Sequence, residues 1–239
     1  MLKNSTSAPL LPNGLLGAVL PVKHPATYTN SFIPVFAELL KGCDTVLDIF
    51  AGVGKLAMIK EHGFIGKVVC NELEREWAEN SPYDVDEWYI SDAANMAWAG
   101  SKSFDAICTS PTYGNRMADH HNAKDGTKRV TYKHFLGRDL NEANTGRMQW
   151  GENYRKKHKD VYKECCRVLK KNGLMVVNVS DHIRKGEVVN VVEWHKKTLV
   201  ELGMKMIDEI KISTPRMGFG QNAKARVQYE CILVFRYCA

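Results

Sequence analysis

The sequence predicts an α/β fold with a Rossmann-like, doubly wound, mostly parallel sheet and an antiparallel terminal strand. Short apolar runs alternate with segments of helical periodicity, and the connections between them are short, which is typical of right-handed βαβ units. The apolar runs at 45–49 and 104–109 each end near a polar or acidic residue. Buried parallel strands of this kind open at their carboxyl ends into a ligand cleft.

The first half of the chain holds four of the predicted strands. Prolines are frequent in residues 1–30, and they predict an extended arm rather than a helix. Apolar residues at helical spacing from Ser31, followed by Gly42, predict the first helix. Strands are predicted at 45–49, 66–72, 87–92 and 104–109, with a further helix at 55–61.

After the fourth strand the alternation of apolar strands and helical segments stops. Residues 114–152 are polar and contain glycine, and we expect them to form an insertion in a single domain of residues 1–239. Order resumes with predicted helices at 153–170 and 187–202 around a strand at 174–179. Strand candidates at 204–213 and 227–237 end the chain and form the expected antiparallel pair.

Composition limits the class of protein. With 239 residues the chain can bury one sizeable α/β core. Its formal charge of +6 is compatible both with a polyanionic partner and with a mildly basic enzyme. The cysteine count is odd at seven and no CxxC occurs, which favours reduced thiols and a cytoplasmic protein. Neither a secretory pattern nor an apolar run of membrane-spanning length is present.

The segment Asp48-Ile49-Phe50-Ala51-Gly52-Val53-Gly54 joins the first strand to the next helix. Small residues there let a ligand approach the backbone and the helix N-terminus. A glycine turn alone is also compatible with dinucleotide binding. Tyr28 and Thr29 lie just ahead of the first predicted helix, where they could cap it or contact a cofactor.

Acids follow the next two strands. Glu72 ends the second strand and can accept both hydroxyl hydrogens of a ribose, while Asp92 follows the third strand and can accept from an adenine amino group. The glycine turn does not read GxxxxGK[ST], and no arginine follows Glu72. A cofactor with a sulfonium and no phosphate therefore fits better than a phosphate-bearing one.

The glycine turn, Glu72, Asp92 and the segment Thr109-Ser110-Pro111-Thr112-Tyr113, taken together, resemble class I S-adenosylmethionine-dependent methyltransferases. More narrowly, they resemble the amino-group DNA methyltransferases of bacteria and phages, whose catalytic tetrapeptide reads (D/N/S)PP(Y/F). The resemblance extends from about residue 28 to 237. It implies S-adenosylmethionine as cofactor, with these residues at its site: Asp48, Phe50, Ala51, Gly52 and Gly54 in the loop, Glu72 at the ribose, Asp92 and Ala93 at the adenine, and Tyr28 and Thr29 nearby.

The resemblance makes Ser110, Pro111, Thr112 and Tyr113 the candidate catalytic residues. The Ser110 hydroxyl and the Pro111 carbonyl would accept the hydrogens of an exocyclic amino group, and Tyr113 would stack on a flipped base. Thr112 stands where the family pattern has a second proline. Serine in the first position favours cytosine N4 over adenine N6.

The basic residues of the insertion are candidates for nucleic-acid binding, because their side chains can neutralise phosphates. They are Arg116, Lys128, Arg129, Lys133, Arg138 and Arg147. His120 and His121 lie in the same stretch without regular ligand spacing, so no metal site is expected.

We therefore expect a DNA amino methyltransferase with DNA favoured over RNA and no membrane partner. One alternative is the same chemistry on an RNA base. Another is a catalytically weak nucleic-acid-binding module of the same fold, for which Thr112 is the indication. An oxidoreductase is disfavoured because the glycine spacing is not GxGxxG. The sequence carries no signal for an oligomeric state.

Overall fold

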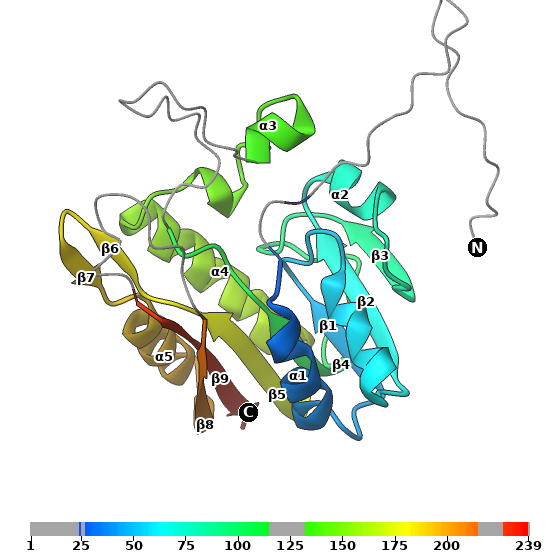
Figure 1. Cartoon of the computed structure of the whole chain (residues 1–239). Helices are drawn as coiled ribbons and strands as arrows, with labels where there is room; N and C mark the ends of the chain where they lie inside the picture. The colour runs from blue at the N-terminus through cyan, green and yellow to red at the C-terminus, as the bar shows by residue number, and fades with distance from the viewer. Residues whose placement is uncertain (1–23, 25–26, 115–131, 215–226, 239) are drawn as a thin grey trace, which may run out of the picture.

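The computed structural model describes residues 24, 27–114, 132–214 and 227–238. Within these residues seven strands form one sheet in the order β3-β2-β1-β4-β5-β9-β8 (Figure 1). The strands are β1 (Thr45–Asp48), β2 (Lys67–Glu72), β3 (Glu87–Ile90), β4 (Phe104–Thr109), β5 (Leu169–Val179), β8 (Met204–Ser213) and β9 (Tyr229–Tyr237). The predicted arm lies almost wholly outside the described residues, as does the loop predicted between the last two strands.

Strand pairing confirms the predicted fold class. β1, β2, β3, β4 and β5 pair in parallel, and β9 is antiparallel to both β5 and β8. In this register Asp48 lies opposite Cys70, and Thr109 lies opposite Val177. The carboxyl ends of β1, β2, β4 and β5 therefore meet at one edge of the sheet.

Helices cover both faces of the sheet (Figure 1). Alternate strand residues enter two buried clusters, one on each face of the sheet, with Leu47 in one cluster and Val46 in the other. This alternation is the period-two pattern of a strand that is buried on both faces. The helical segments are η1 (Asn30–Phe32), α1 (Ile33–Leu39), η2 (Lys55–His62), α2 (Arg75–Glu79), α3 (Tyr132–Leu136), η3 (Thr145–Arg147), α4 (Glu152–Val168) and α5 (Val191–Glu201).

Some element boundaries differ from those predicted. The helix predicted at 55–61 is the 3₁₀ helix η2, which ends one residue later, at His62. A hairpin of β6 (His182–Arg184) and β7 (Glu187–Val189) occupies the start of the predicted helix 187–202. It turns through Lys185 (φ 53°) and Gly186 (φ 84°), two left-handed residues of the kind that two-residue hairpins require. The apolar spacing of residues 187–202 is that of a helix, so it did not predict this hairpin.

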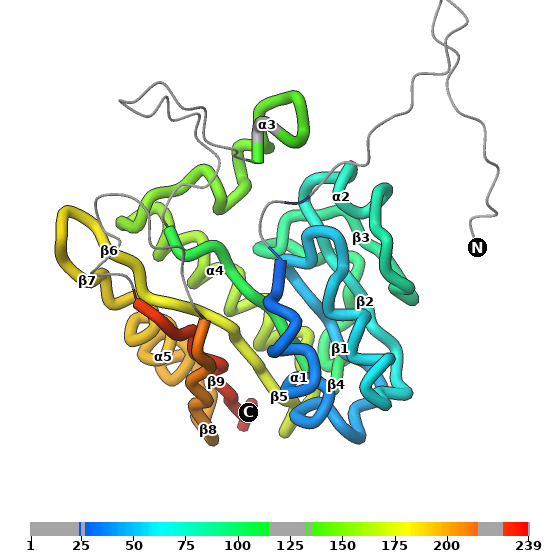
Figure 2. The backbone as a smooth tube through the Cα atoms, in the orientation of Figure 1, coloured from blue at the N-terminus to red at the C-terminus, as the bar shows by residue number. Residues whose placement is uncertain are grey.

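The segment from α3 to the start of α4 lies beyond the carboxyl ends of the strands (Figure 2). It returns to the sheet where the Trp150 N–H donates to the Gly114 carbonyl (2.7 Å). The described part of the predicted insertion therefore packs over the edge where the candidate site residues meet. Among the described residues, no helix combines the length and apolar character needed to cross a membrane.

Candidate active site

Asp48 joins the carboxyl ends of β1 and β4. It is fully buried, and its carboxylate accepts hydrogen bonds from the hydroxyls of Thr109 (2.8 Å) and Tyr28 (3.0 Å) and from the Phe50 N–H (3.2 Å). Burial raises the pKa of Asp48 to about 6, against the lowering effect of these bonds. Thr29, by contrast, is exposed and makes no side-chain capping bond.

The glycine loop, residues 49–54, requires its glycines. Gly52 and Gly54 have φ angles of 55° and 78°, which glycine adopts without strain. A Cβ on Gly54 would lie 2.7 Å from Val85 and 2.8 Å from Trp88, and one on Gly52 would lie 3.1 Å from the His24 ring. The backbone conformation and its close neighbours therefore both select glycine.

The other predicted loop residues pack beneath this turn. Ala51 is buried, and its N–H donates to the Asn71 carbonyl (3.2 Å) of β2. Phe50 is half-buried, and its ring centroid lies 5.8 Å from that of His158 on α4. The loop is thus anchored to the neighbouring strand and to a helix on one face of the sheet.

Glu72 ends β2 and lies directly beside the glycine loop. One carboxylate oxygen accepts from the Gly52 N–H (2.7 Å), and the other accepts from the N–H groups of Leu73 (2.8 Å) and Glu74 (2.9 Å). Burial raises the pKa of Glu72 to about 7, with Glu74 adding to the rise and the three N–H bonds opposing it. The structure therefore brings Glu72 and Gly52 together, as the sequence predicts.

Asp92 and Ala93 follow β3 and differ in environment. Ala93 is buried in the core on the α4 face. One oxygen of Asp92 accepts from the Ala94 N–H (2.9 Å), and the other pairs with the Lys157 ammonium of α4. The sequence did not predict this ion pair, which occupies one of the two oxygens expected to face an adenine amino group.

The 110–113 turn leaves the end of β4 with Pro111 buried and Ser110, Thr112 and Tyr113 half-buried. The Ser110 Oγ lies 3.4 Å from the Tyr113 Oη. The Thr112 hydroxyl donates to the Thr145 hydroxyl (3.0 Å), and the Thr112 carbonyl accepts from the Tyr154 hydroxyl (2.5 Å). Side chains from beyond the turn therefore fix it on several sides.

Two residues at this site, Glu230 and Asn178, were not predicted from the sequence. The Tyr113 hydroxyl donates to the Glu230 carboxylate (2.8 Å) of β9, and the Asn178 amide of β5 donates to the same oxygen (3.0 Å). Both Glu230 and Asn178 are buried, and the Asn178 Oδ1 has no partner among the described residues. Each is a polar residue inside an apolar strand, and that is the signal that would have identified it.

Asp181 and His182 lie just past the carboxyl end of β5. The Asp181 carboxylate accepts from the Val192 N–H (2.8 Å) at the start of α5. His182 begins β6 and is half-buried beside the backbone of Tyr113, and burial lowers its pKa. Asp181 therefore caps a helix, while His182 borders the 110–113 turn.

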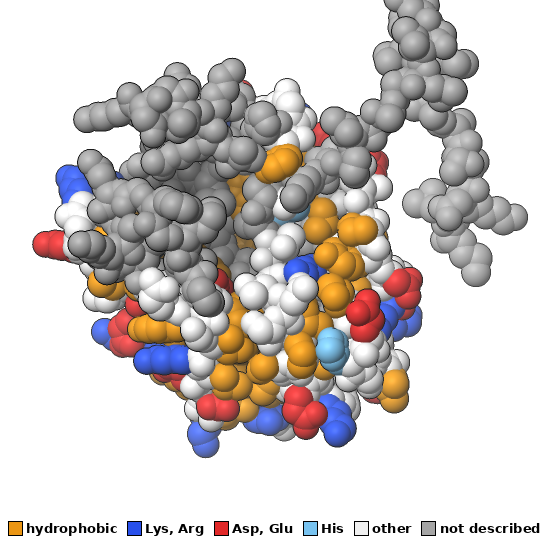
Figure 3. Space-filling model, viewed as in Figure 1, with side chains coloured by type: hydrophobic (Ala, Val, Ile, Leu, Met, Phe, Trp, Pro, Cys, Tyr) orange, Lys and Arg blue, Asp and Glu red, His pale blue; other side chains and the backbone are white. Residues whose placement is uncertain are grey.

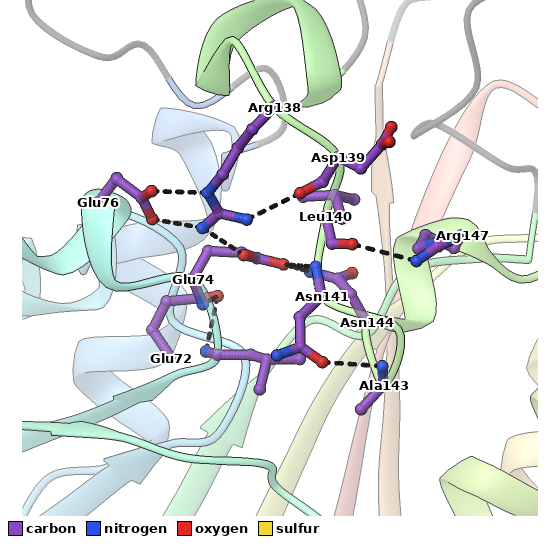
Figure 4. Close-up of polar contacts among 11 residues, drawn as sticks. Glu72, Glu74, Glu76, Arg138, Asp139, Leu140, Asn141, Ala143, Asn144 and Arg147 are labelled. Atoms are coloured by element: carbon purple, nitrogen blue, oxygen red, sulfur yellow. Dashed lines mark hydrogen bonds and ion pairs between the residues drawn. The ribbon is translucent and has the colours of Figure 1, made fainter.

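Arg138 is held by acids at the end of β2. Its guanidinium donates to Glu76 (2.6 and 2.7 Å) and to Glu74 (2.8 Å), as Figure 4 shows. Glu74 is 1% exposed, and it also accepts from the Asn141 N–H (2.8 Å) and the Asn144 side chain (2.9 Å). In the structure Arg138 therefore latches the insertion to α2, and its charge is already paired.

The remaining predicted phosphate ligands are only partly described. Arg147 donates to the Leu140 carbonyl (3.1 Å) within the insertion (Figure 4). Lys133 lies on α3, whereas Arg116, Lys128 and Arg129 lie outside the described residues. On the face shown in Figure 3, the Lys and Arg side chains of the described residues are interspersed with Asp and Glu. His120 and His121 also lie outside the described part, within which no three metal-ligating side chains cluster.

Solved structures of similar fold include methyltransferases, and the sheet described above matches their Rossmann-like fold. The N-methyltransferase NodS from Bradyrhizobium japonicum WM9, solved with S-adenosyl-L-homocysteine, has 11% identity and a TM-score of 0.51 over 85% of this chain and 83% of its own. A methyltransferase from Pyrococcus furiosus has 16% identity and a TM-score of 0.52 over 86% and 83%. The [4+2]-cyclase SpnF is equally similar, at 13% identity and a TM-score of 0.55 over 87% and 81%. Fold similarity at this level therefore does not define the reaction.

The family is defined by sequence. The family model N6_N4_Mtase, described as DNA methylase, matches residues 104–238, which is more than half of the chain. The chain belongs to this DNA methylase family and is an S-adenosylmethionine-dependent methyltransferase. The search of functionally curated proteins gave no match.

The residues of the glycine loop and of β2 fit this cofactor. Glu72 makes three hydrogen bonds with its carboxylate, which leaves acceptor capacity for a ribose hydroxyl. Gly52 brings backbone to the same place without a side chain. The Glu72 carboxylate beside the Gly52 backbone is therefore suited to the ribose diol of a cationic cofactor rather than to a phosphate.

Proposed function

We propose that this chain transfers a methyl group from S-adenosylmethionine to an exocyclic amino nitrogen of a DNA base, with cytosine N4 favoured over adenine N6. The observation that carries the proposal is the hydrogen bond between Thr109 and Asp48 (2.8 Å). It holds the end of the glycine loop's strand against the residue that immediately precedes Ser110. A methyl donor on the loop and an amino group on the turn would then be neighbours.

The chemistry requires an amino nitrogen whose lone pair is free. In a base this lone pair is delocalised into the ring, so the nitrogen is a poor nucleophile. The Ser110 hydroxyl oxygen and the Pro111 carbonyl would accept its two hydrogens and favour a tetrahedral geometry. The cofactor, when bound, supplies an electrophilic methyl group on a sulfonium. The new N–C bond would use the nitrogen lone pair, and the C–S bond pair would pass to sulfur. One amino proton would pass to Ser110 as the Ser110 proton moves through the Tyr113 hydroxyl to the Glu230 carboxylate.

Glu230 explains how a serine can serve as the acceptor. A carboxylate only accepts hydrogen bonds, so Tyr113 must donate its hydroxyl proton to Glu230. The Tyr113 oxygen is then the acceptor for the Ser110 proton, across the 3.4 Å that separates the two hydroxyls. This orientation leaves the lone pairs of Ser110 for an incoming amino group. Such contacts are often long without substrate and tighten in the reacting complex.

The choice of base and polymer rests on the turn and the family. Serine in the first position of the tetrapeptide favours cytosine N4, and no Pro-Cys pair of the kind used for ring-carbon methylation occurs in the sequence. Membership of the DNA methylase family favours DNA over RNA. For phosphate binding we propose Arg116, Lys128, Arg129 and Lys133, and we exclude Arg138 because Glu74 and Glu76 already pair with it.

A methyl-transfer assay on three polymers tests the proposal. The chain is incubated with methyl-labelled S-adenosylmethionine and duplex DNA, single-stranded DNA or RNA, and the washed polymers are counted. We expect label in DNA. Label only in RNA would favour the alternative reaction on an RNA base, and label in none of the polymers, despite measurable cofactor binding, would favour a binding module.

A further inference from the structure

Thr112 is the point at which this chain departs from the family pattern, and the structure surrounds it with hydrogen bonds. Proline at this position would fix the backbone φ angle through its ring. Threonine lacks that restraint. Here its carbonyl accepts from the Tyr154 hydroxyl (2.5 Å), and its hydroxyl donates to Thr145 (3.0 Å). The residue is therefore held from α4 and from η3 at once.

The Tyr154 hydroxyl belongs to a buried series of three hydrogen-bonded side chains. It lies 3.1 Å from the His195 Nε2, and the His195 Nδ1 lies 2.6 Å from the Tyr162 hydroxyl. Tyr154, Tyr162 and His195 are all 0% exposed. Tyr154 and Tyr162 lie eight residues apart on α4, and His195 faces them from α5.

The direction of each hydrogen bond in this series of side chains follows from the groups at its two ends. The Thr112 carbonyl can only accept, so the Tyr154 proton points to it, and the Tyr154 oxygen must accept from His195 Nε2–H. Burial lowers the pKa of His195 well below its usual value, so the ring is neutral and its Nδ1 accepts from Tyr162. Every polar atom is thereby satisfied, and each bond supports the next.

The hydroxyl of Tyr154 acts on the turn, whereas its ring acts on the core. The ring centroid lies 5.1 Å from that of Trp150 and 3.9 Å from that of His158, and phenylalanine would keep these contacts. Only the hydroxyl reaches Thr112. Its removal therefore separates positioning of the turn from packing of α4.

We propose that Tyr154 and Thr145 are positioning residues that hold the 110–113 turn in its reactive geometry in place of the second proline. The inference rests on the proposed function, in which Pro111 and Ser110 accept the amino hydrogens. Misplacement of reacting groups by about 1 Å costs on the order of 100-fold in rate. A turn released from Tyr154 would therefore bind cofactor normally and react slowly.

The test is a double-mutant cycle between Tyr154→Phe and Thr112→Pro. We expect Tyr154→Phe to lower kcat about 10-fold to 100-fold while the Kd for S-adenosylmethionine stays within twofold. On the Thr112→Pro background the same substitution should cost less than threefold, because the proline ring restrains the turn. Thr145→Val, which keeps the shape of the side chain, should lower kcat about threefold to tenfold.

Tyr162→Phe is the matched control for lost stability, since it removes an equally buried hydroxyl at the end of the hydrogen-bonded series that is distant from Thr112. It should lower the melting temperature as much as Tyr154→Phe does but lower kcat less than threefold. Equal losses of kcat in the two variants, or an equal cost of Tyr154→Phe on both backgrounds, would overturn the proposal.

Hydrogen exchange of the peptide spanning residues 108–114 provides a readout that does not need activity. Tyr154→Phe should accelerate exchange there, and Thr112→Pro should slow it again. If the unsubstituted protein methylates no polymer, the proposed function fails while this readout still decides the positioning role. Unchanged exchange in Tyr154→Phe would contradict that role by itself.

Discussion

The two halves of the sheet edge are held by different kinds of contact. On the cofactor side, the buried carboxylates of Asp48 and Glu72 accept four hydrogen bonds from backbone N–H groups of the glycine loop and of the residues after β2. Asp48 accepts two more from the hydroxyls of Thr109 and Tyr28. On the turn side, side chains from β9, η3 and α4 hold Tyr113 and Thr112. The Glu230 carboxylate accepts from the Tyr113 hydroxyl, the Thr145 hydroxyl accepts from the Thr112 hydroxyl, and the Tyr154 hydroxyl donates to the Thr112 carbonyl. Binding of the cofactor and geometry of the reaction can therefore be disturbed separately.

The largest effect is expected at the 110–113 turn. Tyr113→Ala removes the stacking ring and the contact with Glu230, and we expect kcat to fall by about 1,000-fold. Ser110→Ala should fall into the same range because it removes an acceptor. Calorimetry should find the Kd for S-adenosylmethionine within threefold of that of the unsubstituted protein. Normal turnover in either variant would show that the turn is not the reactive site.

The cofactor side should give the opposite pattern. Glu72→Ala removes the carboxylate beside Gly52, and we expect the Kd for S-adenosylmethionine to rise about 100-fold, as for the loss of charged hydrogen bonds. Asp48→Ala should behave similarly, with added disorder of the loop. At saturating cofactor Glu72→Ala should keep most of its kcat. A loss confined to kcat would remove the distinction between the two halves.

The buried acids also predict how stability depends on pH. The folded-state pKa of Glu72 is raised from 4.5 to about 7, so the folded protein binds more protons than the unfolded chain between these values. Stability should therefore fall as pH rises, by about 2 kcal/mol between pH 4.5 and pH 7. Glu72→Gln should flatten this slope in urea unfolding measured across that range. A stability that rises with pH in both proteins would show that Glu72 is ionised at little cost.

Arg138 distinguishes a structural latch from a phosphate ligand. Arg138→Ala leaves Glu74 buried without its guanidinium partner, and we expect a loss of about 2 kcal/mol in the free energy of unfolding. The salt dependence of DNA binding should not change. Arg147→Ala, which loses only a bond to a carbonyl, is the control and should cost less than half as much. If DNA affinity depended less steeply on salt concentration in Arg138→Ala than in the unsubstituted protein, Arg138 would be a phosphate contact.

A smaller effect on kcat than that of Tyr113→Ala is expected at Glu230. Glu230→Gln keeps the size of the side chain but can donate as well as accept, so the Tyr113 and Ser110 hydroxyls lose their fixed direction. We expect kcat to fall about tenfold with unchanged cofactor affinity, whereas Glu38→Gln on the exposed side of α1 should have no effect. An equal response to both substitutions would mean that Glu230 has no part in orienting Ser110.

The sequence predicts the cofactor half better than the turn half, for a physical reason. The glycine loop and Glu72 each lie at the end of an apolar strand, so local pattern and the rule for parallel sheets place them together. Tyr154, Thr145 and Glu230 reach the turn from 33 to 117 residues away. No periodicity reports such contacts. Arg138 shows the same limit, because its partners Glu74 and Glu76 lie 64 and 62 residues away in the sequence and no local pattern predicts these ion pairs.

The atom that receives the methyl group distinguishes the proposed reaction from its alternatives. DNA treated with the protein and deuterium-labelled S-adenosylmethionine is digested to nucleosides and analysed by mass spectrometry beside DNA treated with Ser110→Ala. We expect labelled N4-methyldeoxycytidine from the unsubstituted protein and almost none from the variant. Label on the cytosine ring carbon, or equal label from both proteins, would contradict this expectation.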